Sequence, residues 1–375
     1  MQFVDLHRQF GAIELDVRAR IETVLEHKQF IMGPEVRELE GRLAEYVGVK
    51  HALSCSSGTD ALVLALLALG VKRADAVFVP SFTFFATAEA VSLAGATPVF
   101  VDSDADTMNI SPHALEVAVR RTLAEGWLRP RGVIPVDLFG LPADYARIRE
   151  VADRFGLFVL EDAAQGFGAD YGGARAGSLG DAAATSFFPA KPLGCYGDGG
   201  AVFTDDDALA ARMASLREHG KGADRYDNVR VGMNGRLDTL QAAVLLCKLD
   251  VLDAELDARR RIAHAYTAAL DGVLRTPGEP EGYISCWAQY TLRARDLRQR
   301  DIIAGHLREQ GIPVMIYYPV PIHLSIAYEG LGYSKGALPV CEALSETVLS
   351  IPAHPYLTDA ERERIVSAIV EAADE

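Results

Sequence analysis

The feature that most constrains this chain is a repeated alternation of short apolar runs with helix-like stretches between residues 54 and 204. The runs at 77–79, 98–101, 132–136 and 157–160 are apolar almost throughout, which predicts strands buried on both faces. Strands of this kind, separated by helices, predict a mostly parallel α/β sheet with helices on both sides. Ligands of such sheets bind beyond the carboxyl ends of the strands.

A second pattern follows and indicates a smaller domain. A helical pattern runs from Leu237 to about Leu270, and residues 272–282, rich in Gly, Pro and Glu, are typical of a linker. The rest predicts an α+β unit, with strands at 285–293 and 312–317 and helices at 297–310, 340–347 and 359–372. The 375 residues are too many for one simple core. We therefore expect a large domain over residues 1–250 and a small C-terminal domain over residues 251–375.

Composition and charge narrow the possible partners. The chain carries 37 basic and 52 acidic side chains, a net charge of −15, which disfavours nucleic acid and anionic membranes. No apolar stretch is long enough to span a membrane and no secretory leader is seen, so we expect a cytoplasmic protein. Five cysteines without a CxxC pair predict free thiols in a reducing compartment. The nine histidines lack metal-ligand spacing, and no metal site is expected.

Lys191 is the first candidate for chemistry. It lies in the sequence SFFPAKPLG, among aromatic residues, prolines and glycines, whereas lysine usually occupies solvated helix faces. Burial would lower the pKa of its ammonium group, which a lysine that forms an imine requires. The alternative is a lysine on a surface turn, and this motif alone leaves both interpretations open.

Asp162 and Gln165 form the second candidate group. Asp162 ends the apolar strand of VLEDAAQ, so its carboxylate is expected at the carboxyl edge of the sheet. An acid there could keep the pyridine nitrogen of a cofactor protonated, and the alternative is an acid that caps the following helix. Gln165 could hydrogen-bond a ring hydroxyl, or could be an ordinary polar residue in the first helical turn.

The sequence SSGTDA at 56–61 opens an apolar helix and predicts a phosphate site, because free N–H groups and the helix dipole favour anions there. Ser186, five residues before Lys191, could add a hydroxyl to that phosphate. Residues an odd number apart on a strand face opposite sides, so this requires the strand to break near Pro189.

Aromatic residues follow the strand at 77–79, in the sequence SFTFFAT at 81–87. One of them could stack on the face of a pyridine ring. We expect Phe84 to do so, and Phe82 and Phe85 to belong to the core. The order of phosphate loop, aromatic residue, strand-end acid and lysine is more specific than any one of these motifs.

With these motifs in this order, the chain resembles the DegT/DnrJ/EryC1/StrS group of nucleotide-sugar aminotransferases, which depend on pyridoxal 5'-phosphate (PLP), over essentially its whole length. The matching stretches are SCSSGTDAL, SFTFFATAEA, LEDAAQ, SFFPAKPLGCYGDGGA and VGMNGRLDTLQAA. The resemblance implies the PLP-dependent aminotransferase fold, of the aspartate aminotransferase type. It also implies a homodimer with active sites at the subunit interface.

The resemblance implies cofactor contacts from both subunits. Lys191 would be the Schiff-base lysine, and Asp162 the partner of the pyridine nitrogen. The phosphate would be held on one subunit by Gly58, Thr59 and Ser186, and Asn234 would reach it from the other subunit.

The substrate side follows from the same resemblance. Arg236 of the second subunit would approach the substrate, and with Lys221 or Arg225 it could form the basic patch that an anionic substrate requires. For Arg236 the alternative is an interfacial salt bridge.

Within the family, PLGCYGDGG and RLDTLQAA resemble transaminases of UDP-linked 2-acetamido keto-sugars, in particular the 3-keto-uronate type, which implies a role in surface-glycan biosynthesis. The chain departs from that type at Phe30, Ala190 and Tyr317. The 3-keto-uronate type has tyrosine, serine and histidine, respectively, at these three positions. A 4-keto-6-deoxy sugar therefore stays open. The expected substrate-binding residues are Phe30, Arg236, Tyr317, Tyr318 and His323, with ordinary packing as the alternative for His323.

The expected reaction is a ping-pong transamination from glutamate to a nucleotide-linked keto-sugar, with the Lys191 amine as the proton carrier. A PLP-dependent sugar dehydratase of the same fold is one alternative, although such relatives carry histidine in place of this lysine. A non-catalytic sugar-binding or regulatory homologue is another, and it need not keep both Lys191 and Asp162. A nicotinamide-dependent reductase would need GxGxxG in the first βα turn, which is not found.

Overall fold

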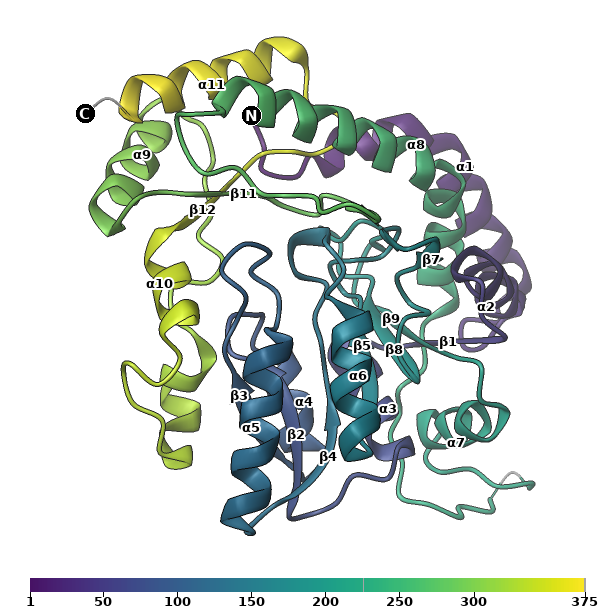
Figure 1. The fold of residues 1–375 in the computed structure, drawn as a ribbon. Coiled ribbons are helices and arrows are strands. Elements are labelled where there is room, and N and C mark those ends of the chain that lie inside the picture. Colours follow the sequence, from purple (N-terminus) through teal and green to yellow (C-terminus); the bar gives the residue numbers. More distant parts are fainter. Residues whose placement is uncertain (225, 374–375) are drawn as a thin grey trace.

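The computed structural model describes residues 1–224 and 226–373. Its large domain is built on a seven-stranded sheet of order β1-β9-β8-β5-β4-β2-β3 (Figure 1). The strands are β1 (His51–Cys55), β2 (Asp75–Pro80), β3 (Thr97–Val101), β4 (Arg129–Val133), β5 (Phe158–Asp162), β8 (Ala182–Ser186) and β9 (Gly200–Thr204). Strand β9 runs antiparallel to both of its neighbours, and the other pairings are parallel. The predicted mostly parallel α/β sheet is confirmed.

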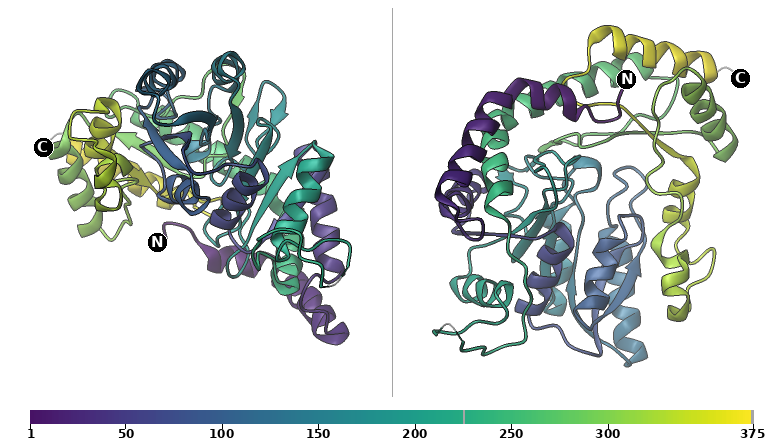
Figure 2. Two further views of the ribbon diagram at one scale, coloured as in Figure 1. Left: turned by 90° about the horizontal axis from the view of Figure 1, so that it is seen from below. Right: turned by 180° about the vertical axis from the view of Figure 1, so that it is seen from behind.

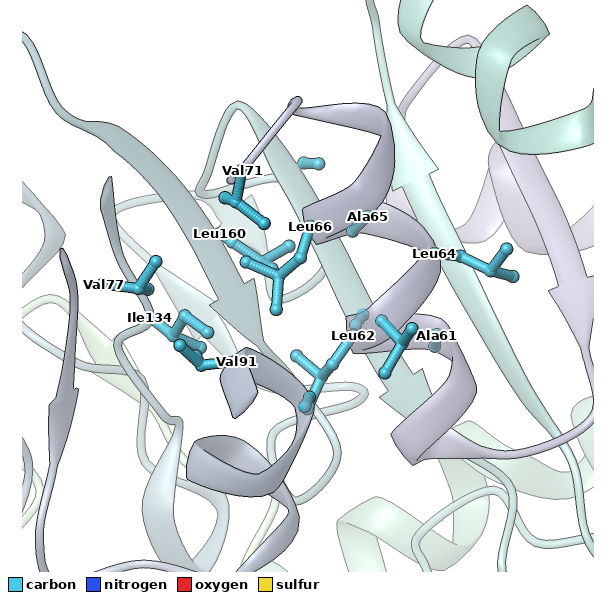
Figure 3. Close-up of a cluster of buried hydrophobic side chains, with 14 of the residues drawn as sticks. Ala61, Leu62, Leu64, Ala65, Leu66, Val71, Val77, Val91, Ile134 and Leu160 are labelled. Atoms are coloured by element: carbon cyan, nitrogen blue, oxygen red, sulfur yellow. The ribbon is translucent and has the colours of Figure 1, made fainter. Parts of the chain in front are cut away.

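Helices cover both faces of this sheet because its strands are apolar on both faces. Val77, Val79 and Leu160 pack with α3, whereas their neighbours Phe78 and Val159 belong to the core under α5 and α6. Figure 3 shows the first of these cores, with the leucines of α3 against the sheet. The helices of this domain are α2 (Pro34–Val47), α3 (Gly58–Ala68), α4 (Ala86–Leu93), α5 (Pro112–Glu125), α6 (Tyr145–Phe155) and α7 (Asp207–Arg217).

The small domain has its own core around a two-stranded sheet. Strand β11 (Tyr290–Arg293) pairs antiparallel with β12 (Val348–Ile351), and helices α9 (Leu297–Glu309), α10 (Pro339–Thr347) and α11 (Asp359–Ala373) follow the expected order. Two strand predictions were wrong in detail. Residues 285–289 precede β11 without pairing in it, and residues 312–317 form only a single bridge, between Met315 and Ser350. Pro313 lacks the N–H group that a regular ladder needs.

Helix α8 (Thr239–Leu270) joins the two domains without a break. Its residues up to Leu256 pack in the core of the large domain, and those from Ile262 onward pack in the core of the small domain. The expected boundary at residue 250 lies inside this helix, whose two ends contribute to different cores.

The N-terminal helix and a late segment also connect the domains. Helix α1 (Leu6–His27) runs along α8, as Figure 2 shows from behind, and Arg8 pairs with Glu361 of α11 at 2.9 Å. The 3-10 turns at Ile322–Leu324 and Ile326–Leu331 return to the large domain, where Tyr328 packs against Phe100. Two short strands, β6 (Asp170–Tyr171) and β7 (Ala174–Arg175), form a hairpin, and β6 also pairs with β10 (Tyr283–Ile284).

Two further expectations concern the whole chain. All five cysteines are buried free thiols, as predicted. Among the described residues, no helix has both the length and the apolar character needed to cross a membrane.

Candidate active site at the carboxyl edge of the sheet

Asp162 is the last residue of β5 and is buried at the carboxyl edge of the sheet. Its Oδ2 accepts a hydrogen bond from Thr87 Oγ1 at 2.9 Å, and its Oδ1 accepts one from the Ala164 N–H group at 3.2 Å. Burial raises the pKa of this carboxyl, and the two donors and the charge of Lys191 counteract the rise. Residues 164–168 form turns and no helix follows, so the helix-cap interpretation does not apply.

Lys191 lies in the loop between β8 and β9, which pair antiparallel. Its backbone N–H donates to the Phe188 carbonyl at 2.8 Å, so a tight turn carries it away from the strand. Burial lowers the pKa of its amine, and the nearby Asp162 carboxylate partly counteracts this. Within the described residues, no acceptor is hydrogen-bonded to Nζ of Lys191. A half-buried, unpaired amine attracted by Asp162 fits a reactive lysine better than a surface turn.

The N-terminus of α3 meets Ser186 at the same edge. Ser57 caps the helix by accepting the Asp60 N–H group at 3.0 Å, which leaves the N–H groups of Gly58 and Thr59 without intrahelical partners. A Cβ atom on Gly58 would lie 2.6 Å from the Cβ of Ser186, so only glycine permits this close approach. Strand β8 ends at Ser186, which provides the break that the sequence argument required. Two free N–H groups and a hydroxyl thus form one small anion-binding cradle.

The segment after β2 separates its aromatic residues as predicted. Phe82 is buried, and Phe85 packs against Tyr328, whereas Phe84 is 56% exposed. The ring of Phe84 lies 6.3 Å from that of Tyr318, at the same edge of the sheet. Phe84 is therefore the aromatic residue of this segment that is open to a ligand.

Gln165 and Tyr318 are hydrogen-bonded to each other. Gln165 Oε1 accepts the Phe139 N–H group at 2.9 Å, and its Nε2 donates to the Tyr318 hydroxyl at 3.2 Å. One hydrogen of the Nε2 amide stays available for a ring hydroxyl. Burial raises the pKa of Tyr318, so its hydroxyl stays protonated over the physiological range.

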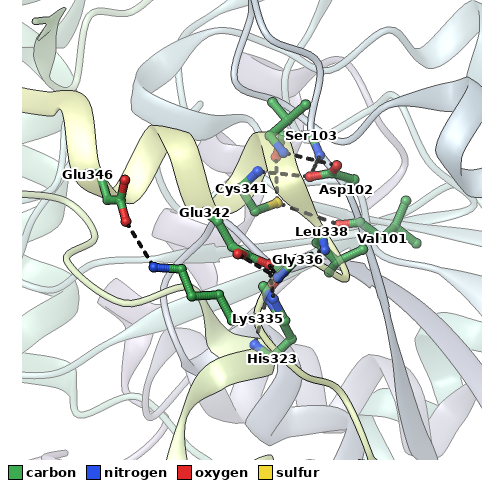
Figure 4. Close-up of polar contacts among 12 residues, drawn as sticks. Val101, Asp102, Ser103, His323, Lys335, Gly336, Leu338, Cys341, Glu342 and Glu346 are labelled. Atoms are coloured by element: carbon green, nitrogen blue, oxygen red, sulfur yellow. Dashed lines mark hydrogen bonds and ion pairs between the residues drawn. The ribbon is translucent and has the colours of Figure 1, made fainter. Parts of the chain in front are cut away.

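His323 is held in a buried network, and substrate contact does not fit its geometry. Its Nδ1 accepts from the Ser81 hydroxyl at 2.7 Å. Its Nε2 is therefore left to donate to Glu342 at 3.2 Å (Figure 4). The side chain has no exposed surface, and burial lowers the pKa of its ring. The network also excludes a hydrolytic triad, because Ser81 is itself fully buried. The packing interpretation of His323 is the one that this environment supports.

The residues expected to act from a second subunit lie on a partly exposed segment. The Ser56 N–H group donates to the Gly235 carbonyl at 3.0 Å, which places residues 234–236 beside the start of α3. Asn234 is exposed, and the Nε atom of Arg236 has no hydrogen-bond partner among the described residues.

Phe30 lies beside this segment, because its carbonyl accepts the Thr239 N–H group at 3.0 Å. Tyr317 is half-buried, with its ring 6.1 Å from that of Phe3. Lys221 is exposed, and Arg225 lies outside the described residues.

Thr87 and Ser57 are site residues that sequence reasoning did not single out. Both lie inside motifs that were recognised, but their partners could not be read from the motif. Thr87 reaches an acid 75 residues away, and only the tertiary fold brings the two together. Ser57 carried a usable signal, since a serine three residues before an acid at a helix start is a typical cap.

The donor set fits pyridoxal phosphate. The aldehyde would meet an unpaired lysine, the ring nitrogen a buried acid, and the phosphate the cradle at the start of α3. The chain belongs to the DegT/DnrJ/EryC1/StrS aminotransferase family, which it matches over residues 12–370. Aminotransferases of this family depend on pyridoxal phosphate. NtdA from Bacillus subtilis, solved with bound pyridoxamine phosphate (PMP), covers all of this chain with 83% of its own, at 28% identity and a TM-score of 0.89.

Three other similar proteins are closer in sequence. The chain is 44% identical to the UDP-2-acetamido-2-deoxy-3-oxo-D-glucuronate aminotransferase of Pseudomonas aeruginosa, over 98% of this chain and 99% of that one. It is 41% identical to the UDP-N-acetyl-3-dehydro-alpha-D-glucosamine 3-aminotransferase of Acidithiobacillus ferrooxidans, over 98% and 96%. A solved family member from Brucella abortus is 50% identical over the full length of both chains, with a TM-score of 0.97.

Proposed function

We propose that this protein transfers an amino group from glutamate to carbon 3 of a UDP-linked 2-acetamido-3-keto-sugar. The observation that carries the transamination is the Lys191 amine, which has no hydrogen-bond acceptor among the described residues and interacts with the charge of the buried Asp162 carboxylate. The carbon-3 position rests on the names of the two relatives from P. aeruginosa and A. ferrooxidans, both of which aminate at that carbon.

Bound pyridoxal phosphate supplies an electron sink for the carbon from which a proton is removed. The residues of the chain supply the rest. Lys191 would take the proton from the donor's α-carbon as a general base. It would then return the proton, as a general acid, to the cofactor carbon that carried the aldehyde. Burial suits it to this task because it favours the neutral amine.

Asp162 holds a proton on the ring nitrogen, which makes the ring electron-withdrawing. Its orientation is fixed by the hydroxyl of Thr87 and by the Ala164 N–H group, one on each carboxylate oxygen. Both donors stabilise the ionised carboxylate and oppose the rise in pKa that burial causes. Asp162 thus has the charge and the fixed position that the role requires.

The remaining contacts position the cofactor. The N–H groups of Gly58 and Thr59 and the hydroxyl of Ser186 would hold the phosphate. The second amide hydrogen of Gln165 would reach the ring hydroxyl, and the ring of Phe84 would cover one face. Tyr318, fixed by Gln165, would border the substrate side of the ring.

A homodimer would complete the site. The chain segments on either side of residues 234–236 carry exposed apolar side chains, here called the interface strip, which are Phe30 (44% exposed), Ile31 (52%), Val229 (53%) and Val231 (95%). Apolar side chains grouped on a surface favour association with another protein surface. A second subunit packed on the interface strip would bring Asn234 to the phosphate and Arg236 to the anionic substrate. This local positive charge would also offset the net negative charge of the chain.

The test runs the reaction in reverse, because amino-sugars are more stable than keto-sugars. The purified enzyme is incubated with 2-oxoglutarate and a panel of UDP-, dTDP- and GDP-linked 3-amino- and 4-amino-sugars, and glutamate is measured. We expect glutamate from UDP-linked 2-acetamido-3-amino-sugars, and the panel includes members with and without a carboxylate at carbon 6. Glutamate from 4-amino-sugars alone would contradict the proposed substrate. Glutamate from no member of the panel, with the cofactor bound, would contradict the transaminase assignment.

A further inference from the structure

Two acids lie directly behind Asp162. Glu161 precedes it on β5, and its side chain therefore leaves the opposite face of the strand. Asp137 lies on the neighbouring chain segment, where its N–H group donates to the Asp162 carbonyl at 3.1 Å. Both side chains belong to residues without exposed surface.

Each acid is held by donors from the surrounding backbone. Glu161 accepts the N–H groups of Gly177 at 2.5 Å and of Leu179 at 2.8 Å, one on each oxygen. Asp137 Oδ1 accepts the Ala143 N–H group at 3.1 Å and the Tyr145 hydroxyl at 2.8 Å. The buried Oδ2 of Asp137 receives no hydrogen bond from a donor group among the described residues. These bonds fix both side chains.

The two acids face each other through a side-chain hydrogen bond. Two ionised carboxylates cannot form such a bond, because both are acceptors only. Glu161 already accepts two backbone donors, whereas Asp137 Oδ2 lacks one, so the proton belongs on Oδ2 and is donated to Glu161. Burial raises the pKa of Glu161 to about 7 and that of Asp137 well above its ordinary value. The other titratable groups that face the pair are Tyr145, Asp162 and Cys286.

We propose that Asp137 and Glu161 share one proton and hold a single negative charge behind Asp162, as a positioning pair for the acid that contacts the cofactor ring. The inference rests on the proposed role of Asp162. The shared proton spares Asp162 a second neighbouring charge, while the remaining charge on Glu161 favours protonation of the ring nitrogen. The pair also fixes the backbone of Asp162 through Asp137.

Amide substitutions distinguish the effect of the proton on Asp137 from the effect of the negative charge on Glu161. In Asp137→Asn, the new amide donates to Glu161 and its oxygen still accepts from Ala143 and Tyr145, so the variant imitates the protonated acid. In the double variant Asp137→Asn with Glu161→Gln, the volume is kept but the charge is removed. The single variant is the matched control for the double variant.

The first measurement uses the apo protein and needs neither cofactor nor substrate. Burial and the neighbouring charge oppose ionisation of both acids at once, so infrared difference spectra should contain the band of one buried carboxylic acid. We expect Asp137→Asn to lose that band. A band that persists unchanged in this variant would overturn the shared proton, and this result does not depend on the enzyme's reaction.

The second measurement titrates the visible absorbance of the holoenzyme with pH. We expect the midpoint in Asp137→Asn to match the wild type, and the midpoint in the double variant to lie at least about half a pH unit lower, because a nearby negative charge is lost. We also expect kcat to stay within about threefold for the single variant and to fall at least about tenfold for the double variant. A folded double variant with an unshifted midpoint would overturn the electrostatic role and leave only packing.

Discussion

The two halves of the site differ in how completely one chain builds them. The inner half, which comprises Thr87, Asp162, Gln165 and Lys191, lies at the edge of the sheet, and its polar contacts come from the same chain. The outer rim, which comprises Phe30, Asn234 and Arg236, lies around the half-buried start of α3 and includes an Nε atom without a partner among the described residues.

This difference indicates which functions belong to which half. Burial shifts the pKa values of the ionisable groups in the inner half, which suits groups that must move protons. The rim keeps its charge and its apolar side chains available, which suits groups that act on a second subunit. The chemistry is therefore expected to depend on one chain, and recognition of the anionic substrate on two.

The largest effect is expected for Lys191→Ala. The loss of the amine removes both the covalent attachment of the cofactor and the proton carrier, so kcat should fall about 10⁴-fold or more. The visible absorbance of the holoenzyme should disappear with it. Lys335→Ala, which removes an exposed lysine paired with Glu346, serves as the control and should change neither quantity. Retained turnover in Lys191→Ala would break the assignment of chemistry to the inner half.

Asp162→Asn should have the next largest effect. The amide keeps the size of the side chain but cannot balance a charged ring nitrogen, so we expect kcat to fall by about 10²- to 10³-fold with the cofactor still bound. Stopped-flow measurement of the first half-reaction with glutamate isolates this step. A loss confined to the KM of the sugar would instead place this acid with the rim.

Part of the pH dependence of apo-protein stability should come from a buried group next to the inner half. His354 lines the same cavity as Lys191 and Arg259, and burial, followed by the charge of Arg259, lowers its pKa to about 4. The folded state binds fewer protons than the unfolded state between this value and about 6.5. The contribution of neutral His354 to the unfolding free energy is therefore fully present above about pH 6.5 and is lost as the pH falls towards 4.

Relative to His354→Gln, the wild type should lose roughly 3 kcal/mol of unfolding free energy over that interval. Urea unfolding at several pH values measures the difference. Parallel stability curves for the two proteins would contradict this prediction.

Arg236→Ala should have the smallest effect on a single site, with an increase of about tenfold in the KM of the nucleotide sugar and little change in kcat. The Arg236→Ala variant is most informative in a complementation experiment. When inactive Lys191→Ala protein is mixed and reassociated with Arg236→Ala, half of the dimers are hybrids, and each hybrid has one intact site if Arg236 acts across the interface. About a quarter of all sites then bind the sugar with the wild-type KM. Sites with only the raised KM would show that Arg236 serves its own subunit.

Asp162, Gln165 and Lys191 could be proposed from sequence because their signals are local. An apolar strand that ends in an acid, a small-residue helix start and a lysine in a constrained loop each follow from a few neighbouring residues. Thr87 and the pair of Asp137 and Glu161 were missed because they are contacts between distant segments, which neither periodicity nor propensity encodes.

The sharing of one helix between two cores could not be predicted for a related physical reason. Helix α8 carries apolar residues along its whole length, but the pattern does not reveal that the first part faces one core and the last part another. His323 resembled a pocket residue because it stands among prolines and tyrosines, yet both of its ring nitrogens bind protein groups.

The most direct test of the account is to reduce the holoenzyme with borohydride, digest it and locate the modified peptide by mass spectrometry. We expect a phosphopyridoxyl group on Lys191 at close to one per chain, and none when the cofactor is removed before reduction. A cofactor attached to another lysine, or a saturated enzyme whose Lys191 peptide stays unmodified, would contradict the central claim.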